Sequence, residues 1–152
     1  MLLTGPAVRA MAEHGDVTFL AGPIGAGAAQ ALPGVNQVMV FDAPWVPADP
    51  HPVRPTVIAD LVADLSRRRF DAAAIFTSAH QSPLPIALLL RLAGIRTIAA
   101  VSHEYPGSLL DFRIRGDPDV HEVERSLMVV DALGMSPSRD DDLHLRIRRS
   151  EL

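Results

Sequence analysis

Short apolar segments and amphipathic segments alternate along this chain from its start to about residue 133. The mostly apolar segments are residues 16–21, 37–41, 72–76 and 97–101. The segments with helical spacing are residues 6–14, 25–32, 56–69, 120–133 and one that ends at residue 93. Short strands without polar alternation are typical of parallel sheets covered on both faces. The pattern therefore predicts an α/β fold, with a Rossmann-like, mostly parallel sheet and flanking helices.

The alternation opens on a helix and not on a strand. Pro6 suits the first turn of a helix, and Thr4 is placed to cap it. Alternating α/β folds normally open on the strand that becomes the middle of the sheet. We therefore expect the four apolar segments to form one parallel sheet, with its first, central strand missing from this sequence. Exposed strand edges would then favour self-association.

Ligands bind at the carboxyl ends of the strands in such a sheet, so the loops that follow the strands are the candidate site. Residues 42–55 contain five prolines and cannot be regular structure. Residues 102–118 are also expected to be irregular. The glycines of residues 22–27 lack the spacing of a dinucleotide fingerprint, so close helix–sheet packing explains them better.

Composition narrows the class of protein. The chain has 152 residues, no cysteine and a formal net charge of −4. It therefore has no thiolate chemistry and no general attraction for nucleic acid. The sequence has no leader pattern and no apolar run of about 18 residues. A cytoplasmic location is expected, with a peripheral association with the inner membrane left open.

The length fits one domain over residues 1–134, followed by the start of an interdomain linker over residues 135–152. Residues 140–142 are three consecutive aspartates within this tail. Three adjacent carboxylates cannot all face one ion, so a hydrated linker is expected there and no metal site.

Polar residues at the strand ends are the candidate ligand contacts. Each has a plainer alternative: helix capping for the first pair, and ordinary loop hydrogen bonding or solvation for the others. A His–Glu pair could do acid–base work, but adjacent residues point in different directions. The candidate acceptor-binding residues are Thr4, Gly5, Ser78, His80, Gln81, Ser82, His103 and Glu104.

Several segments share order and spacing with one family. They read LLTGPAVRA (residues 2–10), LPGV followed by VMVFD (32–42), FDAA (70–73), QSPLP with RLAGI (81–95), and HEVE with LG (121–134). Together they resemble the N-terminal domain of glycosyltransferase family 9, the heptosyltransferase family of lipopolysaccharide core assembly. The likeness extends over essentially the whole chain.

The resemblance implies the GT-B architecture, in which the active site lies between two Rossmann-like domains. The N-terminal domain mainly receives a lipid-linked or saccharide acceptor, and the C-terminal domain holds a nucleotide-sugar such as ADP-heptose. It implies transfer with inversion, without a metal and without a cofactor other than the donor. Backbone N–H groups at Thr4 and Gly5 would favour an anionic group of the acceptor.

The sequence departs from the family at both ends. Family members carry a strand and a Gly-Asp pair just before the position of Leu2, and that aspartate is the candidate general base. Neither the base nor the donor domain is in this sequence. We therefore expect that the chain alone cannot transfer sugar, and no catalytic residue is assigned to it. The alternatives are a non-catalytic α/β binding module and a flavodoxin-like nucleotide-binding domain.

Overall fold

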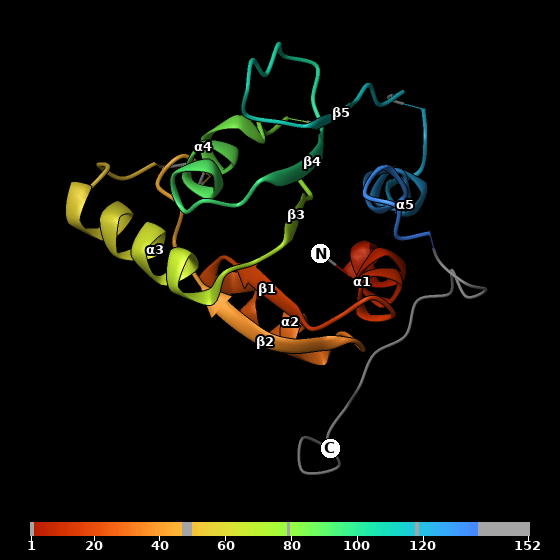
Figure 1. Cartoon of the computed structure of the whole chain (residues 1–152), viewed down its shortest axis with the longest axis horizontal. Coiled ribbons are helices and arrows are strands. Elements are labelled where there is room, and N and C mark those ends of the chain that lie inside the picture. The colour runs from red at the N-terminus through yellow and green to blue at the C-terminus, as the bar shows by residue number, and fades with distance from the viewer. Residues whose placement is uncertain (1, 47–49, 79, 118, 137–152) are drawn as a thin grey trace. The chain divides into compact units, whose positions relative to one another are not determined.

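The structure is a computed structural model that describes residues 2–46, 50–78, 80–117 and 119–136 (Figure 1). These residues form two compact units. The first unit runs to Asp42 and resumes at His121, and the second is Ala43–Val120. The tail beyond residue 136, with the expected linker and its three aspartates, lies outside the described residues.

The first unit is built on a pair of parallel strands, β1 (Val17–Ala21) and β2 (Val35–Val40). The helices α1 (Gly5–Ala12) and α2 (Ala26–Ala31) pack against this pair. Val8 of α1, Val17 of β1 and Leu32, which follows α2, are buried together, and Val35 of β2 packs against them. Two short 3₁₀ helices, Leu2–Thr4 and Pro23–Gly25, precede α1 and α2.

The last helix, α5 (Glu122–Ala132), packs beside α1 (Figure 1). Its apolar side is buried, since Val129 is 1% exposed and Val130 is 0% exposed. On α1, Ala7 and Ala10 are 0% and 1% exposed. Small residues of this kind allow neighbouring helices to approach closely.

The second unit contains a three-stranded parallel sheet in the order β3-β4-β5. The strands are β3 (Ala72–Ile75), β4 (Thr97–Val101) and β5 (Phe112–Ile114). The central strand is the most buried, and Ile98, Ala99 and Ala100 are each 0% exposed. An uninterrupted apolar strand at the centre of a parallel sheet is what the sequence pattern predicts.

Two helices complete the second unit: α3 (Pro55–Arg68) and α4 (Leu84–Leu92), which contact each other. Each has a proline in its first turn, where no backbone N–H is needed. The predicted apolar stripe on α3 is confirmed, because Leu61 and Leu65 are buried. Within the described ranges, no helix has both the length and the apolarity required to cross a bilayer.

The predicted fold class is confirmed, since every described strand pairing is parallel and helices flank the sheets. Three details of the sequence analysis are wrong. The strands form two sheets and not one. Residues 102–118 are not wholly irregular, because β5 lies within them. Thr4 precedes α1 in helical conformation, and its side chain makes no capping hydrogen bond.

The strand order leaves open edges on both sheets. Among the described residues, β1 and β3 each have one hydrogen-bonded neighbour. Self-association through these edges stays a prediction.

Substitution of Gly34 tests how tightly the first unit is packed around this residue. Its φ is +93°, and a Cβ there would lie 2.9 Å from the Cβ of Ala12. Gly34→Ala therefore combines left-handed strain with a clash, and we expect it to lower the free energy of unfolding by about 2–4 kcal/mol. The measurement is urea denaturation followed by far-UV circular dichroism.

The matched control is Gly134→Ala in the same unit. Gly134 has a φ of +77°, but nothing lies within 4 Å of a Cβ built there. This variant should lose only about 1–2 kcal/mol, the cost of the left-handed conformation alone. Equal losses in the two variants would contradict the packing argument.

Candidate functional site

The predicted site residues are divided between the two units. Thr4 and Gly5 belong to the first unit, where Thr4 is 5% exposed and Gly5 is also buried. Gly5 opens α1, and a Cβ there would meet Arg9 and Leu32 at ordinary contact distance. Both residues therefore lie inside the packed start of α1, and their role in acceptor binding stays a prediction.

The other predicted residues lie in the second unit, on the loops that follow β3 and β4. The structure joins these loops directly: the Ser82 hydroxyl donates a hydrogen bond to the Glu104 carboxylate. The same hydroxyl accepts a hydrogen bond of 3.2 Å from the Leu84 backbone N–H at the start of α4. Two residues predicted separately from the sequence are thus in contact.

The loop after β3 turns back on itself before α4. The Gln81 N–H donates to the Ser78 carbonyl at 3.0 Å, which closes a tight turn. Ser78 and His80 are exposed, and Gln81 and Ser82 are half-buried. Ser78 and His80 of this loop are therefore open to solvent.

The loop after β4 is fixed at its start by β5. Arg113 donates from Nε to the Ser102 carbonyl at 3.0 Å and from Nη2 to the His103 carbonyl at 2.7 Å. The Ser102 hydroxyl donates to the Glu104 carbonyl at 3.1 Å. These bonds fix the backbone that carries His103 and Glu104, and both residues are exposed.

The same loop is fixed at its far end by α4. Arg91 donates from Nη2 to the Asp111 carboxylate at 2.6 Å and from Nε to the Ser108 carbonyl at 3.0 Å. The Asp111 carboxylate also accepts the Ile98 N–H at 2.7 Å. Sequence reasoning missed Arg91, Asp111 and Arg113, since nothing in a local pattern marks a contact made 10 to 20 residues away.

The chemistry of this constellation is hydrogen bonding to a polar ligand. An exposed carboxylate, an exposed imidazole and a hydroxyl can accept and donate to the hydroxyl groups of a small molecule. A search of the described residues finds no group of three or more His, Cys, Asp or Glu side chains that could hold a metal ion.

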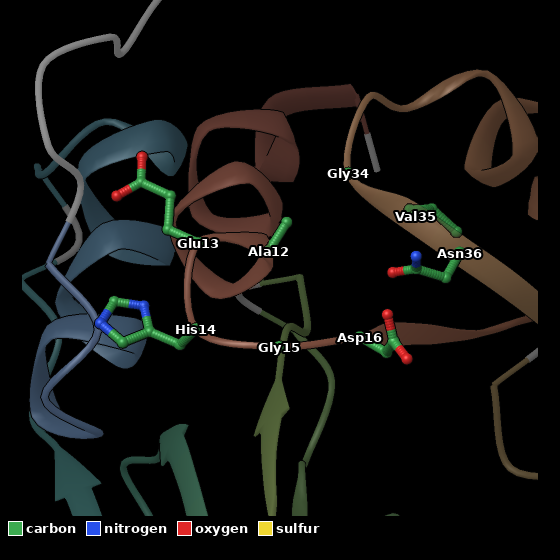
Figure 2. Close-up of a pocket in the computed structure, with 8 residues that line it drawn as sticks. All are labelled: Ala12, Glu13, His14, Gly15, Asp16, Gly34, Val35 and Asn36. Carbon is green, nitrogen blue, oxygen red and sulfur yellow. The ribbon is translucent and has the colours of Figure 1, made fainter.

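A separate polar pocket lies at the amino-terminal ends of β1 and β2, with a volume of about 640 Å³. Figure 2 shows Asp16 and Asn36 close together on one side and Glu13 and His14 on the other. The Asn36 side chain accepts the Val17 N–H at 2.7 Å, so it ties the two strands together. The pocket is at the opposite strand ends from the loops predicted to bind ligand.

The fold and the polar loops define a Rossmann-like α/β protein with candidate ligand contacts at the carboxyl ends of parallel strands. The chain is similar to the solved structure of E. coli ADP-heptose LPS heptosyltransferase II, with a TM-score of 0.71 and 16% sequence identity. The match covers 99% of this chain and 44% of that chain. The sequence matches no family model and no curated protein.

At this identity the likeness shows the fold alone, and the chain spans less than half of the structure that it matches. The fold that the resemblance to glycosyltransferase family 9 implied is thereby confirmed.

Arg91→Lys tests whether the loop after β4 depends on its arginine anchor. Lysine cannot reproduce the forked set of hydrogen bonds to Ser108 and Asp111. We expect the free energy of unfolding of the second unit to fall by about 1–3 kcal/mol. The measurement is urea denaturation followed by the fluorescence of Trp45, the single tryptophan of the chain.

The matched control is Arg67→Lys on α3. Arg67 pairs with Asp64 at 3.2 Å, and its side chain is 69% exposed. An exposed pair of this kind contributes little, so the change should be below about 0.5 kcal/mol. A loss at Arg91 no larger than the loss at Arg67 would show that the loop is held by other contacts.

Proposed function

We propose that this chain is the acceptor-side half of a glycosyltransferase that moves a sugar from a nucleotide-sugar to a saccharide or lipid-linked acceptor. The observation that carries the proposal is the extent of the structural likeness. Nearly the whole chain matches, and it matches 44% of a protein whose structure is described as an ADP-heptose LPS heptosyltransferase. We propose an acceptor of lipopolysaccharide core type, in keeping with that name.

The proposal divides the reaction between two halves. This chain binds and orients the acceptor, and a second domain binds the donor, a nucleotide-sugar such as ADP-heptose. Transfer proceeds with inversion and without a metal, and the general base is not assigned to any residue of this chain. Work on a lipid-linked acceptor would bring the protein to the cytoplasmic side of the inner membrane. Nucleic acid is not a partner, in keeping with the net charge of −4.

The polar loops of the second unit supply the acceptor contacts. The Glu104 carboxylate accepts hydrogen bonds from sugar hydroxyls, and Ser82 holds that carboxylate in place. The exposed groups of Ser78, His80 and His103 extend the polar surface around it. Taken by itself, the start of α1 in the first unit is proposed to offer backbone N–H groups at Thr4 and Gly5 to an anionic group.

Acceptor binding without the donor tests this function. We expect the chain to bind a delipidated lipopolysaccharide core oligosaccharide in isothermal titration calorimetry with no nucleotide-sugar present. Ser82→Ala and Glu104→Gln should each raise the dissociation constant for the oligosaccharide by about 5- to 30-fold, since each removes one polar contact worth about 1–2 kcal/mol.

The controls are Ser66→Ala on α3 and Glu124→Gln on α5, two exposed positions with the same side-chain chemistry. Neither should change the dissociation constant. Binding of ADP-heptose at an affinity equal to that of the oligosaccharide would favour a nucleotide-binding domain instead. Sugar transfer by the chain alone would contradict the division of labour between two halves.

A further inference from the structure

Tyr105 is the one tyrosine of the chain, and its side chain is 85% exposed. It lies in the loop after β4, directly beside Glu104. Single exposed apolar side chains are ordinary on protein surfaces and carry no meaning by themselves. What distinguishes Tyr105 is the backbone on either side of it.

That backbone is held by side chains from three other segments. Ahead of Tyr105, Arg113 of β5 binds the Ser102 and His103 carbonyls, and Ser82 binds the side chain of Glu104. Beyond it, Arg91 of α4 binds the Ser108 carbonyl. The loop is therefore fixed on both sides of an aromatic ring that is itself turned out to solvent.

Between these anchors the backbone makes a local turn at residues 106–109. The Leu109 N–H donates to the Pro106 carbonyl at 3.0 Å, and Gly107 takes a φ of +55° that suits glycine. Little apolar area is buried by residues 103–109, so packing does not account for the order of this loop. Polar anchors account for it instead, and they present the ring in a preformed position.

A sugar ring has an apolar C–H face and a rim of hydroxyl groups. An aromatic ring complements the apolar face, and a carboxylate accepts hydrogen bonds from the hydroxyl groups. A tyrosine has few rotatable bonds, so it loses little entropy when a ligand covers it. Holding the loop in advance lowers the cost of binding further.

A nucleobase also offers a flat face, but its phosphate would need a cationic partner. Arg91 and Arg113 already donate to backbone carbonyls and, for Arg91, to Asp111, whereas Arg115, which follows β5, is exposed. The residue before Tyr105 in the sequence, Glu104, is an acid. An acid next to Tyr105 disfavours a phosphate there, so we expect a neutral, hydroxyl-rich ring rather than a nucleotide.

We propose that Tyr105 stacks on one sugar ring of the saccharide acceptor while the Ser82–Glu104 pair takes hydroxyl groups elsewhere on the same acceptor. This inference rests on the proposed function for the existence of a saccharide acceptor. The inference adds Tyr105 to the proposed acceptor contacts, as the residue that selects a sugar ring with an exposed apolar face.

A single tyrosine makes the test direct. The chain is labelled with ¹³C on the tyrosine ring and titrated with the delipidated core oligosaccharide, and separately with AMP, while ring and amide signals are followed by NMR. We expect the oligosaccharide to shift the ring signals saturably and AMP to leave them unchanged. Tyr105→Ala should weaken oligosaccharide binding about tenfold, and Tyr105→Phe should stay within about twofold.

The control is Leu92→Ala on α4, an apolar side chain in the same unit that is 62% exposed. It should bind as the unchanged chain does, and the amide spectra of all variants confirm that they are folded. Amide shifts at residues 78–82 without a ring shift, or normal binding by Tyr105→Ala, would overturn the stacking role and leave the proposed function standing. Absence of oligosaccharide binding anywhere would overturn both the stacking role and the proposed function. A shift of the ring signals with AMP would show that Tyr105 binds a nucleotide and not a sugar.

Discussion

The carboxylate of Asp111 holds together the elements on which the second unit depends. It accepts a hydrogen bond from Arg91 of α4 and another from the Ile98 N–H of β4, at 2.6 and 2.7 Å. The Asp111 N–H returns a bond of 2.9 Å to the Ile98 carbonyl. Because β4 is the central strand, with Ile98, Ala99 and Ala100 fully buried, this junction aligns β5 and fixes the far end of the loop that carries Glu104 and Tyr105.

The parallel pairing of β3 and β4 brings the proposed ligand-binding loops together. The loops after β3 and β4 leave the sheet at the same edge, so polar residues 22 positions apart in the sequence meet at Ser82 and Glu104. The proposed acceptor contacts are thus set by strand order and by two arginines that touch no ligand in the proposal. The polar pocket in the first unit lies at the amino ends of its strands and does not belong to this arrangement.

Much of the fold could be predicted from the sequence, because buried strands are apolar and the helices carry clear stripes. The strand β5 could not, since it has three residues, an exposed Phe112 and an arginine at its centre. Nor could the division into two sheets, because strand pairing is set by contacts between distant residues. Ser82 and Glu104 were predicted from their place at strand ends, whereas the anchoring role of Arg91 and Arg113 appears only once α4 and β5 are positioned.

Amide hydrogen exchange in the unliganded chain tests the central claim most directly, which is that the loop after β4 is preformed by its anchors. The N–H groups of Ile98, Ser102 and Asp111 bind Asp111, Ile114 and Ile98 respectively. We predict that Ser102 and Asp111 exchange at least about 100-fold more slowly than an unstructured peptide, as slowly as Ile98 and the other amides inside β4. Exchange of Ser102 and Asp111 at the unstructured rate, with β4 still protected, would contradict the claim.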